Sequence, residues 1–511
     1  MVSSKQKDGF KNIMFAIISQ VITLIFGFIV PKLLIEHLGS ESNGLMQTIN
    51  QIFSYFTLIE AGIGTATIQS LYQPITNDDK NEINSILSAT NNYYKKVSII
   101  YLAFLILFAF IFSEVINSSI SVTKVFWIVF FTGLNSVVNF AIQGKYSLLL
   151  DASGKKYIVT IFSSIFLLLN YISKIILLLL GSDLLMIQIV YFFLSLIQVV
   201  GIMIYIRKYY SWINLNVKPN YEAISKKNAV LVHQISALVF NNTDVLLISM
   251  MCGLVSSSIY SMYLMVTNVI NTLFNNIYSG LTSILGQTFF TNIELYKKRI
   301  DLFDLFFQTF VFTISTIVYI FYLPFLKLYT KGFDYNYIFS WLPALFILVV
   351  LLNATRQAWN ITIKVAGHFK QTEWRTILEM ILNISSSIIL INKLGIAGAL
   401  LGTIIALSYR TNDMIWYANK IILKRKPWKT YKLTIINTLI MLTIIYTSKF
   451  IPINTSNYIS MIISAGIYTL VVLPLYYCVV LFCFKDEHKM LVNEFIKYRS
   501  KKNKKKNMKY E

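Results

Sequence analysis

Runs of about 20 apolar residues recur from one end of the chain to the other, and they constrain its fold more than any other feature. A helix of that length crosses the hydrocarbon core of a bilayer, where the backbone must satisfy its own hydrogen bonds. Only 13% of the 511 residues are charged, whereas soluble domains carry about 25%. The sequence therefore predicts an all-α integral membrane protein that crosses the bilayer many times.

Polar breaks between the apolar runs predict fourteen transmembrane helices. These predicted spans lie at residues 12–35, 45–71, 97–116, 124–144, 157–180, 184–206, 229–252, 257–288, 303–326, 338–363, 374–392, 396–419, 431–450 and 458–484.

The distribution of basic residues predicts how the spans are oriented. An even number of spans places both termini on one side of the membrane. If that side is the cytoplasm, the inner segments hold 36 of the 45 Lys and Arg and the outer loops hold 5, as the positive-inside rule requires. The net charge of +22 thus reflects topology, and we expect the basic tail at 485–511 to contact anionic lipid and no nucleic acid.

An internal repeat divides most of the chain into two similar halves. Three residue pairs share one separation of 213 positions: Gly154 and Gly367, Asn170 and Asn383, and Ser173 and Ser386. We therefore predict an N-terminal lobe at 1–210 (spans 1–6), a C-terminal lobe at 211–428 (spans 7–12), two additional helices at 429–484, and the cytoplasmic tail. Two parallel six-helix lobes with a site between them are typical of transporters that work by alternating access.

Motifs for enzymatic chemistry are missing from the sequence. Ser153–Lys156 superficially resembles a phosphate-binding loop, but Leu149 stands where that motif needs glycine. No HExxH motif, catalytic triad pattern or Cys/His metal motif is present. We predict a protein that is not an enzyme and has no cofactor, with a proton or sodium as a candidate coupling ion.

Ionisable residues within the apolar runs are the candidate functional residues, because each costs about 2.5–3.5 kcal/mol at the centre of a bilayer. They are Glu60, Lys174, Asp244, Arg356, Arg410 and Asp413. Arg410 and Asp413 share a helix face, so one interpretation is a self-contained ion pair. Lys174 lies toward the outer end of its span and could extend to the interface. Arg356 and Asp244 lie deeper, which favours a role in a cavity or between helices.

Four segments resemble the polysaccharide transport family, the Wzx-like flippases. They read YFTLIEAGIGTATIQSLYQPITNDD, AIQGKYSLLLDASGKKYI, FNNTDVLLIS and VAGHFKQTEWRTILEMILNISSSIILINKLGIAGALLGTII. That family belongs to a superfamily that includes the multidrug and toxin extruders and the lipid II flippase. The resemblance extends in order from span 1 to span 12 and implies an extruder-like fold with fourteen helices.

The resemblance also implies a function. Family members move an undecaprenyl-pyrophosphate-linked oligosaccharide across the bacterial cytoplasmic membrane for capsule, exopolysaccharide or O-antigen synthesis. A polysaccharide polymerase and chain-length machinery are the implied protein partners. Arg356 and Arg410, with Lys174 third, are the candidate ligands of the pyrophosphate headgroup. Asp244, Glu60 and Asp413 are candidates for a polar network or for ion coupling. Relatives often carry arginines in spans 1 and 2, but this chain has none there.

Other functions stay open from the sequence. A drug or cation extruder of the same superfamily would use acidic cavity residues, for which Glu60 and Asp244 are available. A flippase for a lipid-linked peptidoglycan or teichoic-acid precursor would need similar chemistry. A membrane glycosyltransferase or polymerase usually needs a large loop with acidic residues, which this sequence lacks. Three intramembrane cations favour an anionic lipid substrate.

Overall fold

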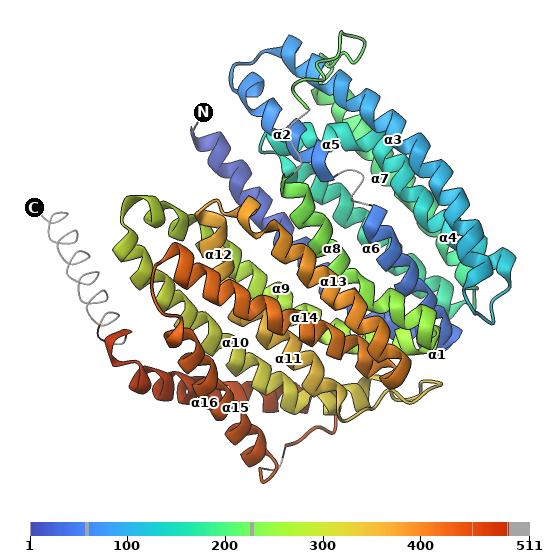
Figure 1. Cartoon of the computed structure of the whole chain (residues 1–511). Coiled ribbons are helices and arrows are strands. Elements are labelled where there is room, and N and C mark those ends of the chain that lie inside the picture. The colour runs from blue at the N-terminus through green and yellow to red at the C-terminus, as the bar shows by residue number, and fades with distance from the viewer. Residues whose placement is uncertain (1, 57–60, 225–228, 452, 488, 490–511) are drawn as a thin grey trace, which may run out of the picture. The chain divides into compact units, whose positions relative to one another are not determined.

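The computed structural model describes residues 2–56, 61–224, 229–451, 453–487 and 489. All regular elements within these ranges are helical (Figure 1). They are α1 (Val2–Phe56), α2 (Ala61–Thr76), α3 (Lys80–Val115), α4 (Val122–Val138), the π-helical turn η2 (Asn139–Gln143), α5 (Gly144–Ala152), α6 (Lys156–Leu179), α7 (Leu184–Tyr209), α8 (Ala229–Cys252), α9 (Leu254–Thr291), α10 (Ile293–Tyr329), α11 (Leu342–Thr355), α12 (Gln357–Val365), α13 (Phe369–Leu394), α14 (Ile396–Tyr417), η3 (Ala418–Ile422), α15 (Trp428–Ser448) and α16 (Tyr458–Cys483).

The predicted spans coincide with these helices over most of their length. Eleven helical segments among the described residues are long and apolar enough to cross a membrane, so this is a multi-pass membrane protein, and the count of fourteen stays a prediction. The first two predicted spans share the label α1, but they are two helical stretches that meet at Gly39, inside the expected loop at 36–44, where the backbone is not helical. The chain bends there at Gly39, whose φ of 81° is one that glycine adopts without strain.

Two helices extend well beyond their predicted apolar spans. α3 begins at Lys80, where Asp79 accepts a hydrogen bond from the backbone N–H of Glu82 at 3.0 Å. α10 begins at Ile293, where Asn292 caps the N–H of Leu295 at 2.9 Å. An Asp or Asn cap satisfies one of the first unpaired N–H groups of a helix. Hydropathy therefore marks the apolar part of each helix, whereas the caps determine where the helix begins.

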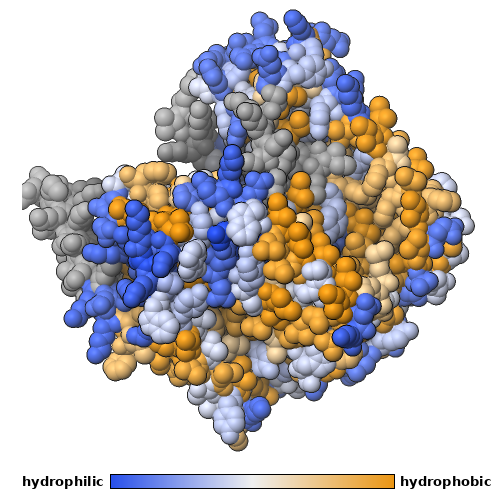
Figure 2. Space-filling view, in the orientation of Figure 1, coloured by the Kyte–Doolittle hydropathy of each residue, from blue (hydrophilic) through white to orange (hydrophobic). Residues whose placement is uncertain are grey.

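Apolar side chains cover much of the surface that Figure 2 shows. On α3, Ile99 and Phe110 are exposed, and on α16, Ile459 and Leu470 are exposed. Soluble proteins rarely expose large contiguous apolar areas. Contact with lipid acyl chains explains these exposed rows of Ile, Leu and Phe along long helices.

The predicted internal repeat is visible in the local backbone. Each boundary of α12 lies 213 positions after the corresponding boundary of α5, and α13 begins 213 positions after α6. Gly154 and Gly367 occupy the turns that follow α5 and α12, with φ values of 73° and 72°. Asn170 and Asn383 are both buried. The two halves therefore repeat a broken helix, a glycine turn and a helix with a buried asparagine.

The described residues divide into two compact units. The first includes those of Met1–Met265, Gly332–Asn336 and Ile384–Ala399, and the second includes those of Val266–Lys331, Tyr337–Asn383 and Leu400–Glu511. Within the first unit, α1 packs against α6 and α8, around a core that contains Leu45, Ile49 and Leu105. Within the second unit, α10 packs against α11, α15 and α16. The predicted lobe boundaries stay predictions.

A close backbone approach in the first unit depends on Gly44. A Cβ at this position would overlap the backbone carbonyl oxygen of Leu254, at the start of α9. We expect Gly44→Ala to lower the free energy of unfolding by about 1–3 kcal/mol, because the backbone must move to admit a methyl group. Thermal unfolding of the purified protein in detergent tests this expectation. Gly27→Ala is the matched control, since Gly27 lies in the same helix with no atom within 4 Å of an added Cβ. Equal midpoints for the two variants would contradict the close approach.

Candidate functional site

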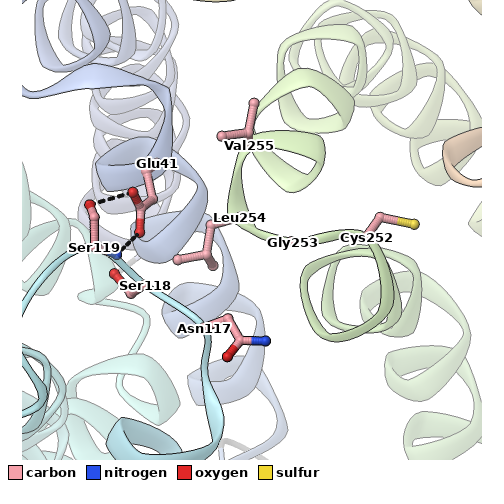
Figure 3. A pocket seen from close by; sticks show the side chains of 8 residues that line it. All are labelled: Glu41, Asn117, Ser118, Ser119, Cys252, Gly253, Leu254 and Val255. Atoms are coloured by element: carbon pink, nitrogen blue, oxygen red, sulfur yellow. Dashed lines mark hydrogen bonds between the residues drawn. The ribbon is translucent and has the colours of Figure 1, made fainter.

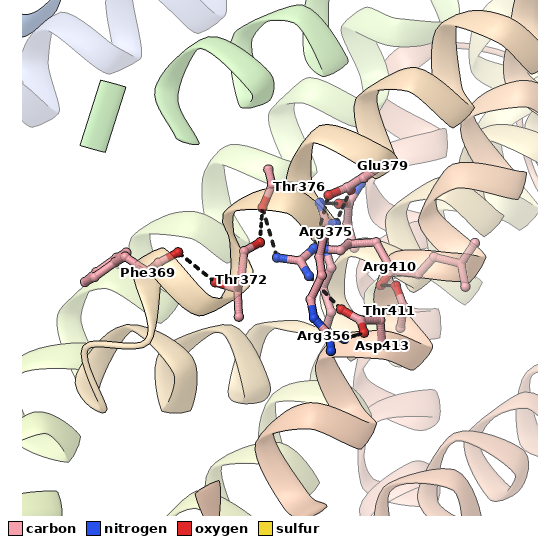
Figure 4. Close-up of polar contacts among 11 residues, drawn as sticks. Arg356, Phe369, Thr372, Arg375, Thr376, Glu379, Arg410, Thr411 and Asp413 are labelled. Carbon is pink, nitrogen blue, oxygen red and sulfur yellow. Dashed lines mark hydrogen bonds and ion pairs between the residues drawn. The ribbon is translucent and has the colours of Figure 1, made fainter. Parts of the chain in front are cut away.

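Five charged side chains gather in the second unit, one at the break between α11 and α12 and two each on α13 and α14 (Figure 4). We call this group the arginine cluster; its members are Arg356, Arg375, Glu379, Arg410 and Asp413. Arg356, Arg410 and Asp413 are candidate functional residues from two predicted spans, 338–363 and 396–419, and the fold brings these three together.

Local backbone geometry positions Arg356 at a helix break. It stands between α11 and α12 with φ −83° and ψ −11°. The hydroxyl of the preceding Thr355 donates a hydrogen bond to the backbone carbonyl of Leu351 at 2.9 Å. Hydrogen bonds of this kind, from a Thr hydroxyl to the carbonyl four residues earlier, often bend helices. The side chain of Arg356 therefore projects from a junction between two helices.

Glu379, on α13, lies between two arginines. Nη1 of Arg356 donates a hydrogen bond to Oε1 of Glu379 at 2.5 Å. Nε of Arg410 lies 3.4 Å from Oε2 of the same carboxylate. Because each oxygen faces a different guanidinium, this carboxylate joins α13 both to the break at Arg356 and to α14.

Asp413, on α14, is held in the same manner. Nη1 of Arg410 donates to Oδ2 of Asp413 at 2.7 Å, and Nη1 of Arg375 donates to Oδ1. Arg410 and Asp413 form the expected ion pair, but the pair is not self-contained, because Asp413 also binds Arg375 and Arg410 also faces Glu379. Guanidinium and carboxylate groups thus alternate along the cluster, which compensates charges that would be costly inside a membrane. Three arginines against two carboxylates leave one positive charge.

Neutral groups complete the cluster. Nη2 of Arg356 donates to Oδ1 of Asn353 at 2.7 Å, and Nη2 of Arg410 donates to Oγ1 of Thr376 at 3.1 Å. The guanidinium of Arg375 lies 4.8 Å from the ring centroid of Trp374 and 4.9 Å from that of Tyr417, within the range of a cation–π interaction.

Exposure separates the three arginines. The side chains of Arg356 and Arg375 are 15% and 18% exposed, whereas that of Arg410 is 3% exposed. Arg410 is therefore the buried centre of the cluster and the other two are its accessible ends. An anion that reaches the cluster meets Arg356 or Arg375 first.

Two members of the cluster, Arg375 and Glu379, are not among the candidate functional residues that the sequence indicates. Arg375 lies near the predicted start of span 11, where its charge contributes to the inner basic residues that set the topology. Glu379 is the only charged residue between Ile377 and Asn392. That is the same signal that identified Asp244, so the sequence contained enough information to find it.

Lys174 belongs to the first unit. Its Nζ, on α6, lies 5.3 Å from the ring centroid of Tyr191 on α7. A second lysine of this unit, Lys145, is buried and donates a hydrogen bond to the carbonyl of Ala141 in the turn η2 at 3.2 Å. From the sequence, Lys145 is expected only to contribute to the basic inner side of the membrane. In the described part of the chain, neither Nζ has a carboxylate within ion-pair distance, so both cations suit an anionic ligand.

Asp244 joins helices within the first unit. It is buried on α8 and accepts a hydrogen bond from the hydroxyl of Tyr260, on α9, at 3.0 Å. Its neighbour Thr243 shares a hydrogen bond of 2.8 Å with the hydroxyl of Tyr55 on α1. A role for Asp244 in ion coupling stays a prediction. Glu60 lies outside the described residues.

A pocket of about 460 Å³ lies at the helix ends of the first unit (Figure 3). Its lining comes from Glu41, the turn at 117–119 and residues 252–255. The carboxylate of Glu41 accepts hydrogen bonds of 2.5 Å from both the backbone N–H and the hydroxyl of Ser119. The lining residues include one acid and no base, so this pocket does not suit an anionic headgroup. Among the described residues, no group of three His, Cys, Asp or Glu side chains could hold a metal ion.

Comparison with known proteins places this fold among membrane transporters. The model of a family described as "Polysaccharide biosynthesis protein" matches residues 10–283. A search of curated proteins finds no match.

Solved structures show the same fold at low sequence identity. The lipid II flippase MurJ in an inward closed conformation is similar with a TM-score of 0.65 and 13% identity, over 92% of this chain and 100% of that chain. An inward-facing multidrug resistance MATE family transporter of the MOP superfamily gives a TM-score of 0.62 and 12% identity, over 79% of this chain and 95% of that one. A MOP superfamily transporter from Pyrococcus furiosus gives 0.51 and 11%, over 83% and 97%. The predicted all-α, extruder-like fold is confirmed.

Proposed function

This chain belongs to the polysaccharide biosynthesis protein family, and we propose on that premise that it is a flippase for a polyprenyl-linked oligosaccharide. Its substrate is an undecaprenyl-pyrophosphate-linked repeat unit, which it moves from the inner to the outer leaflet of a bacterial cytoplasmic membrane by alternating access. Capsule, exopolysaccharide or O-antigen synthesis uses the product. The protein acts as a transporter without enzymatic chemistry, and both termini lie in the cytoplasm.

This proposal rests on the net positive charge of the arginine cluster. Arg356, Arg375 and Glu379 of this cluster lie in two helical segments, Leu342–Val365 and Phe369–Leu394, that are long and apolar enough to cross a membrane. A pyrophosphate cannot enter hydrocarbon without compensation of its charge. Arginine suits this task because its planar fork matches phosphate oxygens in a bidentate manner and stays protonated.

The members of the cluster have different roles in this mechanism. Arg356, accessible at the helix break, binds the headgroup in exchange for part of its contact with Glu379. Arg410, buried between the two carboxylates, holds Glu379 and Asp413 in position and adds its charge to the local field. Lys174 is a third candidate ligand, on the first unit. Asp244 is a candidate for cation coupling, in which a proton or sodium drives the transport cycle.

A drug extruder of the same superfamily is the alternative, since MATE transporters share the fold. A cationic drug would be repelled by a net positive cluster, which favours the anionic lipid. Precursors of peptidoglycan or teichoic acid that carry a polyprenyl pyrophosphate would satisfy the same chemistry, and the sugar has to be found by experiment. A glycosyltransferase or polymerase is the least favoured alternative.

Deletion of the gene in the source bacterium tests the proposal. We expect surface polysaccharide to disappear and lipid-linked repeat units to accumulate, while sensitivity to cationic dyes stays unchanged. Expression of the wild-type gene from a plasmid should restore the polymer. Normal polymer together with increased dye sensitivity would contradict the flippase and support the extruder.

A further inference from the structure

A patch of lysines and aromatic rings lies at one end of the first unit, where α6 begins and α7 ends. Asn12 of α1 joins this end to the turn before α6, because its Nδ2 donates to the carbonyl of Gly154 at 2.9 Å and its Oδ1 accepts from the backbone N–H of Tyr157 at 2.6 Å. We call the patch the α6–α7 basic patch; its members are Lys11, Lys155, Lys208, Tyr157, Tyr209 and Tyr210.

Lys155 is held in one position within the patch. Its Nζ donates a hydrogen bond to the hydroxyl of Tyr210 at 3.2 Å and lies 5.4 Å from the centroid of the same ring. The side chain is half-buried, and within the described ranges no carboxylate lies within ion-pair distance of it. Because the hydroxyl of Tyr210 accepts from Lys155, its own proton can be donated. A cation and a hydroxyl donor are therefore presented together, and both suit the oxygens of a phosphate.

Positive charge exceeds negative charge around this pair. The segments 7–12, 151–157 and 205–210 hold six bases and two acids, an excess of four positive charges. One of the acids, Asp151, already pairs with Lys156 at 3.1 Å. The lysines also lie over rings, with Nζ of Lys11 5.0 Å from the centroid of Tyr157 and Nζ of Lys208 5.5 Å from that of Tyr209. Basic and aromatic side chains of this kind are typical of the headgroup level of a membrane.

The matching turn of the second unit shows that the fold does not require a lysine here. His368 lies 213 positions after Lys155 and follows Gly367 as Lys155 follows Gly154. Nδ1 of His368 lies 3.0 Å from the hydroxyl of Tyr417, at the end of α14. An imidazole therefore makes the contact that joins the turn to the end of the following helix. The cation of Lys155 needs another reason, and an anionic ligand supplies one.

An exposed apolar row on α7 leads directly to the patch. Phe193, Ile197, Val200 and Ile204 are all exposed, and their spacings of four, three and four residues place them on one face of the helix. One further turn brings Lys208 onto this face. An apolar face that ends in cations matches a ligand with acyl chains and an anionic headgroup.

We propose that the α6–α7 basic patch binds an anionic phospholipid of the surrounding membrane. Its phosphate contacts the ammonium of Lys155 and the hydroxyl of Tyr210, while Lys208 adds positive charge and the acyl chains lie along the exposed row of α7. Basic sites between transmembrane helices bind anionic lipid headgroups in this way. The bound lipid stabilises the joined ends of α1, α6 and α7. This binding does not depend on the proposed transport function.

Native mass spectrometry of the purified full-length protein tests the site without any transport assay. The protein is titrated at pH 8, in detergent, with equal amounts of phosphatidylglycerol and phosphatidylcholine, and the lipids retained are counted. We expect the wild type to retain phosphatidylglycerol in preference. Lys155→His copies the second unit, and an ordinary imidazole is mostly neutral at this pH. It should weaken phosphatidylglycerol binding about fivefold, the contribution of one lysine near an anionic surface.

Further variants separate recognition from misfolding. Lys155→Arg keeps the charge and should bind nearly as the wild type does. Lys208→Gln, at an exposed position, should also weaken binding, and it tests the patch even if Lys155→His fails to fold. Lys298→Gln removes an exposed lysine of the second unit and should leave binding unchanged.

Three results would overturn the lipid site. The first is unchanged phosphatidylglycerol affinity in both Lys155→His and Lys208→Gln. The second is equal retention of phosphatidylglycerol and phosphatidylcholine by the wild type. The third is complete displacement of phosphatidylglycerol by millimolar inorganic phosphate, which would identify the ligand as a soluble anion.

Discussion

We expect Arg356→Ala to abolish surface polysaccharide while the protein remains in the membrane at its normal level. Its removal takes away the accessible headgroup ligand and lowers the charge of the arginine cluster from one to zero. Glu379 keeps a partner, because Nε of Arg410 lies 3.4 Å from its second oxygen, so the fold should tolerate the change. Polymer on the cell surface and protein in isolated membranes are the two measurements.

Two further variants test whether the loss of polymer is specific to the guanidinium of Arg356. Arg356→Lys retains the charge without the planar fork, so partial polymer synthesis would show that charge alone contributes and that the bidentate geometry supplies the rest. Arg299→Ala removes an arginine of the same unit whose guanidinium donates to Thr288 at 2.7 Å, and it should leave the polymer normal. Wild-type polymer in Arg356→Ala would remove Arg356 from the mechanism.

The second large effect concerns stability. Glu379→Gln leaves three arginines against one carboxylate and removes the negative charge between Arg356 and Arg410. We expect a loss of about 3–5 kcal/mol in the free energy of unfolding, because an uncompensated buried charge remains. Denaturant unfolding in detergent micelles measures it, and the amount of protein in the membrane should fall accordingly.

A double variant identifies the cause of that loss. Glu379→Gln with Arg410→Met restores the net charge of one, so it should be more stable than Glu379→Gln alone, with a coupling energy that a double-mutant cycle reports. Glu294→Gln is the control, since this exposed carboxylate pairs with Lys297 at the surface and should change stability by less than about 1 kcal/mol. Additive effects of the two substitutions would show that Glu379 and Arg410 do not interact in the folded protein.

The helices, the membrane class and the repeat could be predicted from the order of residues along the chain. Each of these depends on residues that are close together along the chain or on a fixed separation: the apolar runs, the pair Arg410 and Asp413 three positions apart, and the offset of 213 that reappears in the boundaries of α5 and α12. A bilayer strengthens such signals, because a chain inside it must form helices to satisfy its backbone.

Contacts between side chains of different helices could not be predicted in this way and became known from the folded arrangement. Glu379 lies between Arg356 and Arg410. The hydroxyl of Thr430 donates a hydrogen bond to Asp304, 126 positions earlier in the chain. The absence of a side chain at Gly44 allows the backbone of Leu254 to lie against it. Such contacts depend on the rotation of each helix about its own axis and on its position along that axis relative to its neighbours. Because lipid-facing and core-facing positions of a membrane helix are both apolar, hydrophobicity does not specify either quantity. Packing and inter-helix hydrogen bonds specify them, and these form only when the helices come together.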